Sequence, residues 1–232
     1  MRPDHISEVR TLELFSDMPD ENFAILTRGA YVQTFPPQVE LITEGDTADF
    51  LHIVVAGGVE LFAGWNGRET SMATLRPIST FILAATIRDA PYLMSARTIE
   101  KSRVIMLPSD DVREVFNGDN NFARAVVAEL AHYYRAVVKN TKDLKLRTSL
   151  ERLANYLIRC RAKNGGADAF ELNIGKRRLA SYLGMTPENL SRAFKALRPY
   201  GVEVEAANVR ITDFPELEKL AKPTPLIDDK AL

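Results

Sequence analysis

The segment 176–200 reads KRRLASYLGMTPENLSRAFKALRPY and gathers hydrogen-bond donors and acceptors at helical spacing. The side chain of Arg192 can donate two hydrogen bonds to guanine, and that of Glu188 can accept from the amino group of cytosine. Ser191 can reach a base or a phosphate, whereas lysines and flexible arginines suit phosphates, which position a protein without specifying sequence. We predict that eight residues contact DNA: Lys176, Arg177, Thr186, Glu188, Asn189, Ser191, Arg192 and Lys195.

The same segment has the pattern of a helix-turn-helix. Arg178–Leu183 is predicted to form a first helix, and Gly184 permits a tight turn. Thr186 then offers a capping hydroxyl, and Pro187 suits the first turn of a second helix. Leu190, Phe194 and Leu197 give that second helix a buried stripe. A helical pair that only resembles this motif is the alternative interpretation.

Two further features support a nucleic-acid partner. Val202–Val204 and Val209–Ile211, joined by four short or polar residues, are typical of a hairpin wing beside such helices. The chain carries a net charge of -1, but segment 146–200 holds eleven Lys and Arg against four Asp and Glu, a local balance of +7. Local charge sets the field that a polyanion meets. A solvated basic face without a partner is the plainer interpretation of this charge.

The first half of the chain has the pattern of a separate domain that is rich in β-strands. After two short helices expected between Ile6 and Tyr31, short β-branched runs alternate with turn residues, and Asn66-Gly67 indicates a tight hairpin. This pattern predicts a sandwich or barrel within an α+β chain. The expected strands are Val39–Thr43, Leu51–Val55, Val59–Ala63, Thr70–Leu75, Ser95–Thr98 and Val104–Leu107.

A long helix is expected from Asn121 to Leu146. Its apolar residues recur at intervals of three, four and seven, which favours a seam against another helix: Phe122, Val126, Leu130, Tyr133, Val137 and Leu144. Two copies of the chain could pair along this seam, or the seam could pack on the chain's own barrel. A further helix is expected over Leu150–Arg161, with a strand over Phe170–Ile174, and the segment after Ala221 is expected to be loosely ordered.

Composition excludes several classes of protein. Cys160 is the single cysteine, and His5, His52 and His132 are scattered, so no metal site and no metal-dependent enzyme, such as a cupin-like oxygenase, can be recognised. We therefore expect no catalytic residues. No apolar run suits a signal peptide or a membrane span, which predicts a cytoplasmic protein without a membrane partner.

From about Phe15 to Phe214 the chain resembles the CRP/FNR family. The resemblance rests on Glu44-Gly45-Asp46, on Gly57-Gly58-Val59, and on the E-x-x-S-R motif of Glu188, Ser191 and Arg192. It implies a cyclic-nucleotide-binding-like jelly-roll β-barrel over residues 1–118, a dimerisation helix over 119–147 and a winged helix-turn-helix over 148–232. It also implies a homodimer, a palindromic DNA site with TTGA-like halves, and contact with RNA polymerase.

The resemblance also bears on what the barrel senses. Members that bind cyclic AMP carry glycine and glutamate where this chain has Leu83 and Ala84, and arginine where it has Met94; only the serine, Ser95, is retained. A cyclic phosphate without a cation is costly to bury, so cyclic AMP is not expected. We instead expect a small aromatic or hydrophobic effector, or a carboxylate if Arg68, Arg88 or Arg97 turns inward. The predicted pocket comprises Phe81, Leu83, Met94, Ser95, Tyr134, Val137 and Val138.

Two alternatives to such an effector stay open. These residues could be plain core packing in a regulator that needs no effector. His132 could ligate the iron of a gas-sensing haem, which makes haem a possible cofactor. The iron-sulfur cluster of some family members is not expected, because their N-terminal cysteines are absent. The ending from Ala221 to Asp228 loosely resembles alphaproteobacterial regulators of 4-hydroxybenzoate degradation, nitrogen-oxide metabolism or iron transport.

Overall fold

The computed structural model describes residues 9–172 and 174–229. They form two compact units that divide within one long helix, between Tyr133 and Tyr134. His5, and Ile6 at the start of the first expected helix, lie outside the described residues. Among the helices of these residues, none is both long and apolar enough to cross a membrane.

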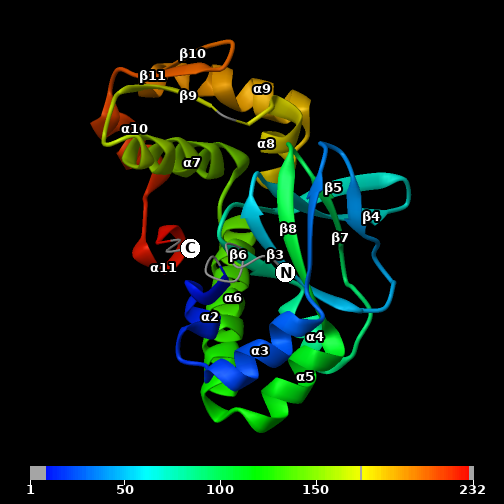
Figure 1. Ribbon diagram of the computed structural model, residues 1–232. Coiled ribbons are helices and arrows are strands. Elements are labelled where there is room, and N and C mark those ends of the chain that lie inside the picture. Colours follow the sequence, from blue (N-terminus) through cyan, green and yellow to red (C-terminus); the bar gives the residue numbers. More distant parts are fainter. Residues whose placement is uncertain (1–8, 173, 230–232) are drawn as a thin grey trace. The chain divides into compact units, whose positions relative to one another are not determined.

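The first unit is built on two four-stranded antiparallel sheets, with strand orders β1-β8-β3-β6 and β2-β7-β4-β5 (Figure 1). They form a jelly roll rather than a single closed barrel, in agreement with the predicted fold class. The strands are β1 (Tyr31–Phe35), β2 (Glu40–Ile42), β3 (Phe50–Ala56), β4 (Val59–Trp65), β5 (Arg68–Leu75), β6 (Ser79–Phe81), β7 (Ser95–Thr98) and β8 (Ser102–Pro108).

All six predicted strands are present, with ends that differ by up to two residues. The hairpin between β4 and β5 is confirmed: Trp65 pairs with Arg68, and both turn residues, Asn66 and Gly67, have positive φ angles. Strands β1 and β6 were not predicted. β1 is largely exposed and β6 has three residues, so neither carries a strong apolar alternation.

Strand β3 serves two hydrophobic cores because it is buried on both faces. Leu51 and Ile53 point into a core shared with the helices, whereas Val54 points into the core between the two sheets. The described helices of this part are α2 (Glu13–Ser16), α3 (Asp20–Arg28), α4 (Leu83–Arg88) and α5 (Ser109–Gly118), and α3 packs against α5 (Figure 1).

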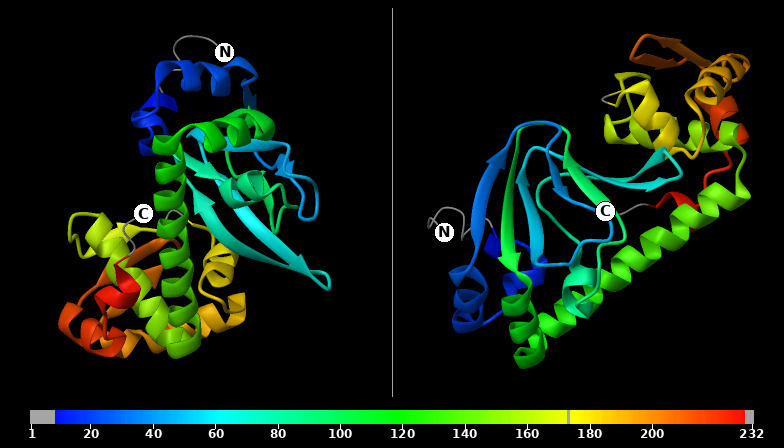
Figure 2. Two further views of the ribbon diagram at one scale, coloured as in Figure 1. Left: turned by 90° about the horizontal axis from the view of Figure 1, so that it is seen from below. Right: turned by 90° about the vertical axis from the view of Figure 1, so that its right-hand side faces the viewer.

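The long helix α6 spans Asn120–Leu146, one residue more than predicted (Figure 2). Much of its expected seam is used within the chain. Phe122 and Val126 are buried in the core that includes α3 and α5, and the Tyr133 hydroxyl donates to the Thr80 carbonyl at 3.0 Å. For these three residues the prediction of an intermolecular seam is wrong, because the apolar spacing marks the face that packs on the chain's own first unit.

The second unit begins with the second half of α6 and contains a three-stranded sheet of order β10-β11-β9. Helix α7 confirms the predicted helix, and its capping box joins Thr148 and Glu151. In place of the predicted strand Phe170–Ile174 there is a shorter one, β9, which ends at Glu171. The two predicted strands of the wing are present. The elements are α7 (Ser149–Lys163), β9 (Ala169–Glu171), α8 (Lys176–Tyr182), α9 (Pro187–Ala196), η1 (Arg198–Tyr200), β10 (Val202–Glu205), β11 (Asn208–Ile211), α10 (Phe214–Ala221) and α11 (Pro225–Asp228).

Candidate nucleic-acid interface

Helices α8 and α9 form the predicted helix-turn-helix. α8 begins two residues earlier than expected, so Lys176 lies in its first turn. Gly184 turns the chain with a φ angle of +62°. Thr186 then caps α9, because its hydroxyl accepts a hydrogen bond from the backbone N–H of Asn189 at 3.2 Å, and Pro187 is the first helical residue.

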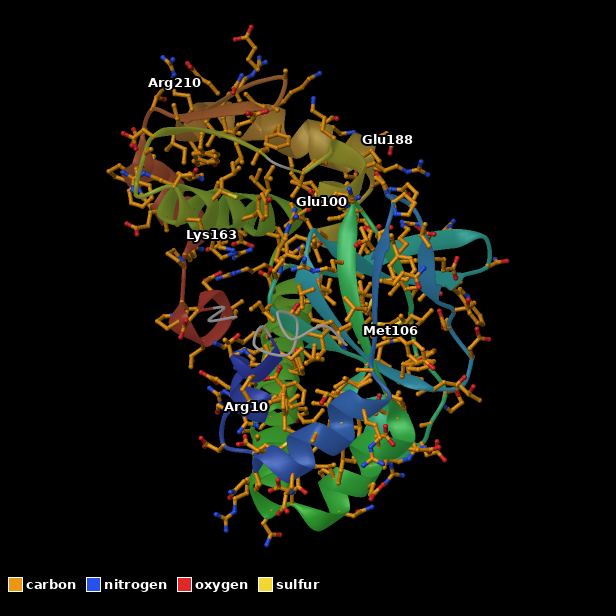
Figure 3. The ribbon with its side chains drawn as sticks, in the orientation of Figure 1. Arg10, Glu100, Met106, Lys163, Glu188 and Arg210 are labelled. Carbon is orange, nitrogen blue, oxygen red and sulfur yellow. The ribbon has the colours of Figure 1, made fainter. Side chains whose placement is uncertain are left out.

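One face of α9 is buried and the other is open. Leu190, Ala193 and Phe194 pack into the core of the second unit, and Leu197 at the C-cap is fully buried. Figure 3 marks Glu188 on the outside of the unit, near the start of α9. All eight side chains predicted to contact DNA are exposed: Lys176, Arg177, Thr186, Glu188, Asn189, Ser191, Arg192 and Lys195.

The exposed groups differ in what they can offer. Hydrogen bonds from its own backbone N–H and from Thr186 lower the pKa of Glu188, so its carboxylate is an acceptor at neutral pH. The Ser191 hydroxyl donates to the Pro187 carbonyl at 3.0 Å, which leaves its lone pairs for an outside donor. Arg192 keeps its planar fork of donors on the same exposed face as Glu188, four residues away.

The basic charge of this part of the chain is not all available to DNA. Arg147 and Arg159 pair with Asp228, at 2.6 and 3.0 Å, and Arg161 pairs with Asp168 at 2.8 Å. These cations hold the second unit together instead of facing a partner. The count of +7 therefore overstates the charge of the interface, which depends on exposed residues such as Lys176, Arg192 and Lys195.

Arg152 has a structural role that the sequence analysis missed. This buried guanidinium donates to the carbonyls of Arg147 and Leu183, at 2.7 and 2.8 Å, and more weakly to those of Leu144 and Gly184. The end of α6 and the turn of the helix-turn-helix are thereby held by one side chain. Helix C-termini favour a cation, which explains how the charge is tolerated although no carboxylate of the described residues pairs with it. A count of charges alone cannot distinguish such an arginine from a surface one.

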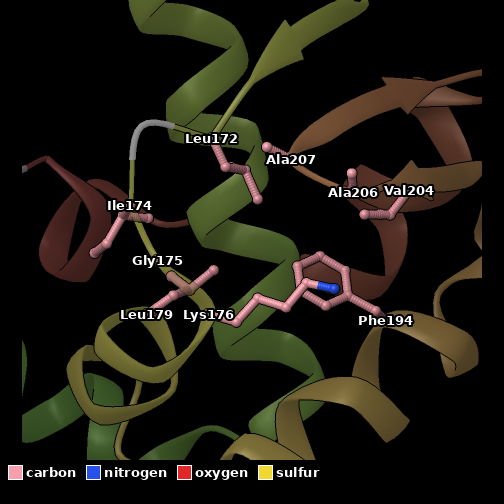
Figure 4. Close-up of a pocket in the computed structure, with 9 residues that line it drawn as sticks. All are labelled: Leu172, Ile174, Gly175, Lys176, Leu179, Phe194, Val204, Ala206 and Ala207. Atoms are coloured by element: carbon pink, nitrogen blue, oxygen red, sulfur yellow. The ribbon is translucent and has the colours of Figure 1, made fainter.

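A hollow of about 240 Å³ lies between the wing hairpin and the helix-turn-helix (Figure 4). Its walls are apolar except for Lys176. Since the stem of a lysine can lie on apolar surface while its ammonium group stays in water, Lys176 suits a phosphate contact from this position. The lining residues are Leu172, Ile174, Gly175, Lys176, Leu179, Phe194, Val204, Ala206 and Ala207.

The predicted effector residues of the first unit divide between its two cores. Phe81 and Met94 belong to the core between the sheets, and the buried Ser95 hydroxyl accepts from the Glu44 N–H at 2.9 Å. Leu83 instead lies in the core that includes α3 and α5, so the structure does not place it beside Phe81 in one apolar cluster. Arg97 is held by Glu60 and Glu69, and both Arg68 and Arg88 are exposed.

The predicted effector residues of α6 are open to solvent. Tyr134 is 71% exposed, Val137 62% and Val138 40%, and Val127 on the same helix is 62% exposed. These residues recur at helical spacing and so lie along one side of α6. An apolar stripe of this kind on a long helix suits a partner helix.

His52 is the polar side chain that the sequence analysis left without a role. Its ring stacks on Phe81 with centroids 4.9 Å apart, and burial lowers its pKa to about 4, partly offset by a hydrogen bond to the Phe50 backbone. Its Nδ1 atom is buried without a partner among the described residues. By contrast, His132 is exposed on α6. The described residues contain no group of three or more His, Cys, Asp or Glu arranged to hold a metal.

Comparison with known proteins agrees with this architecture. Residues 32–119 match the cyclic nucleotide-binding domain family, and residues 151–220 match the Crp-like helix-turn-helix domain. A CRP-like cAMP-activated global transcriptional regulator of Mycobacterium tuberculosis is 23% identical, covering 90% of this chain and 96% of that protein. The transcriptional activator protein FnrA of Stutzerimonas stutzeri is 25% identical over 75% of this chain and 73% of its own length.

Among solved structures, FixK2 from Bradyrhizobium japonicum has the same fold, with a TM-score of 0.68 at 23% identity, covering 84% of this chain and 98% of FixK2. A jelly-roll effector domain followed by a winged helix-turn-helix defines a DNA-binding transcription regulator rather than an enzyme. The chain belongs to the CRP/FNR family. The predicted family is thereby confirmed.

Proposed function

We propose that this regulator is a homodimer that binds a palindromic DNA site with TTGA-like half-sites. The observation that carries the proposal is the open face of α9, where Glu188, Ser191 and Arg192 stand in the half of the helix that begins at a capped N-terminus. Recognition helices read bases with this half. Arg192 reads guanine with two hydrogen bonds, and the ionised Glu188 accepts from cytosine. Lys176, Arg177 and Lys195 bind phosphates.

The dimer forms along the exposed stripe of α6. Val127, Tyr134 and Val138 are exposed, and by the period of the helix they lie beside the face of Phe122, Val126 and Tyr133 that packs on the first unit, not on it. Two such stripes in contact bury apolar area, which is the main favourable contribution to association. This surface replaces the predicted seam of Phe122, Val126 and Tyr133. Two-fold symmetry then requires a two-fold symmetric operator.

The effector binds in the jelly roll and is a small aromatic or hydrophobic molecule rather than cyclic AMP. Leu83, Ala84 and Met94 stand at the positions where cyclic-AMP-binding members have glycine, glutamate and arginine. The nearby Arg97 is already paired with Glu60 and Glu69. A cyclic phosphate would therefore lose its water without gaining a cation in the predicted pocket. Residues 32–119 match the cyclic nucleotide-binding domain family, and one relative is a cAMP-activated regulator. Any test of the effector must therefore include cyclic AMP.

Two experiments test this function. In a selection from random duplexes, the purified chain is expected to enrich two inverted TTGA-like half-sites about one helical turn apart; enrichment of single, unpaired sites would contradict the dimer. In thermal-shift titrations, aromatic acids and phenols are expected to stabilise the protein and cyclic AMP is not. A stoichiometric haem complex lost in His132→Ala would favour the haem alternative, and no response to any compound would favour a regulator without an effector.

A further inference from the structure

The last described residues form a strap against the rest of the second unit. This C-terminal strap, residues 222–229, contains α11, which Thr224 caps, and its Ile227 is 6% exposed. The expectation of a loosely ordered tail is therefore wrong. A four-residue helix has no stability of its own, so contacts with other elements must hold it. The strap lies beyond residue 220, where the match to the Crp-like domain ends.

Asp228 is the centre of these contacts. Its two carboxylate oxygens accept from Arg147 at 2.7 and 2.6 Å, and one of them also accepts from Arg159 at 3.0 Å. Asp143 adds a second carboxylate to Arg147 at 3.0 Å. All four side chains are at most 16% exposed, and their charges balance. Burial opposes ionisation of Asp228, but hydrogen bonds from Arg147 and the Thr224 backbone outweigh burial and lower its pKa.

These contacts meet at the joint between two helices. α6 ends at Leu146 and α7 begins at Ser149, so Arg147 lies within the joint, whereas Arg159 lies near the far end of α7. One carboxylate therefore connects the joint to the body of α7. Two lysines of α6, Lys139 and Lys142, donate to backbone carbonyls of Asp229 and Leu226 and fix the strap to the other side of the joint.

The position of the strap is compatible with pairing through α6. By the period of the helix, Lys139 and Asp143 lie on the side away from Tyr134, whereas Lys142 lies next to Val138. With the strap in place, Tyr134 and Val137 are still 71% and 62% exposed. The exposed apolar stripe of α6 therefore stays open. The recognition helix α9 packs directly on α7, so the angle at the joint also sets the direction of α9 relative to α6.

We propose that Asp228 is a positioning residue: through the C-terminal strap it fixes the joint between α6 and α7 and thereby sets the half-site spacing that the dimer accepts. This inference rests on the proposed function, because it needs two recognition helices on one palindrome. A rigid joint presents the second helix to its half-site at a high effective concentration. A loose joint leaves each helix able to bind a half-site but spreads the distances between them.

The test compares Asp228→Asn with Asp229→Asn in the full chain. Both variants remove one negative charge at adjacent positions, but the Asp229 side chain is exposed and outside the ion-pair cluster. Fluorescence anisotropy measures affinity for the selected palindrome, for one half-site, and for palindromes with one or two base pairs added to the spacer. Asp228→Asn is expected to weaken binding to the original palindrome about tenfold. The affinity of Asp228→Asn for one half-site should stay within about twofold of the wild-type value, so that the preference for the original spacing is lost. Asp229→Asn should have the wild-type affinity for every duplex.

The outcomes separate this inference from the proposed function. A wild-type protein that binds a palindrome no better than a half-site contradicts the proposed dimer. If the wild type prefers one spacing and Asp228→Asn keeps that preference, the role of the strap is wrong. An equal loss on palindrome and half-site also overturns it, because that pattern indicates damage to the DNA-binding unit. If Asp228→Asn does not fold, Arg159→Gln is tested instead, because it removes one of the two ion pairs of Asp228. The same loss of spacing preference is expected.

Discussion

Gly184 lies against Leu144, so that a Cβ atom at Gly184 would stand 2.6 Å from the Cδ2 atom of Leu144. The turn of the helix-turn-helix thus touches the last turns of α6. Gly184→Ala is expected to lower the free energy of unfolding by about 2–4 kcal/mol, because alanine disfavours the positive φ angle and overlaps Leu144. Urea unfolding measures the loss. Gly175→Ala, at an open position in the same unit, serves as the control.

A second substitution separates the two causes. In a Leu144→Ala background the overlap is removed and only the backbone cost of about 1–2 kcal/mol should remain. An equal loss in both backgrounds would show that Leu144 does not obstruct a side chain at Gly184.

Arg192 and Lys195 are predicted to differ in how their loss affects DNA binding. Arg192→Ala should weaken binding to the selected site by about 1–3 kcal/mol and relax the preference at one base pair. Lys195→Ala should weaken binding to all sequences alike. It should also reduce the slope of log K against log salt concentration by about one unit. Competition binding at several salt concentrations measures both effects. A base-specific loss in Lys195→Ala would reverse the two assignments.

Tyr134 is predicted to lie in the dimer interface. Tyr134→Asp places a charge in the middle of the apolar stripe of α6, and an unpaired charge is costly to bury. The dimer is expected to dissociate at least about tenfold more readily, which sedimentation equilibrium measures. Leu93→Asp changes an apolar residue outside α6 that is 82% exposed, and should leave the dimer intact. Unchanged association in Tyr134→Asp would place the interface elsewhere.

His52 should make stability depend on pH. Its pKa is about 4 in the folded protein and about 6.5 when unfolded, so the unfolded chain binds more protons between these values. The contribution of His52 to the free energy of unfolding is therefore fully present above about pH 7. It falls by about 3 kcal/mol as the pH drops toward 4. His52→Leu should flatten this part of the urea-midpoint curve against pH, whereas His132→Leu, at an exposed position, should not. An unchanged slope in His52→Leu would show that His52 is not the responsible group.

Much of the fold could be predicted from local patterns. Asn66-Gly67 specified a hairpin because both residues tolerate positive φ angles, and Thr186-Pro187 specified the start of α9 because its cap and first turn are local features. The family and the exposed face of α9 follow from such signals. Strand β1 lacked them, since it is largely exposed and is held mainly by its pairing with β8.

The class of protein, the recognition helix and most of the order of the elements could be predicted from the sequence, because turn, cap and periodicity signals depend on neighbouring residues. Which side chains bind one another became evident from the folded structure alone. Arg147, Arg152 and Arg159 look like surface cations in the sequence, yet Asp228 and backbone carbonyls distant in the chain bind them. Likewise, the period of α6 cannot show whether a partner or the chain's own core covers Phe122. Burial depends on residues far apart in sequence, and composition and spacing do not encode their distances.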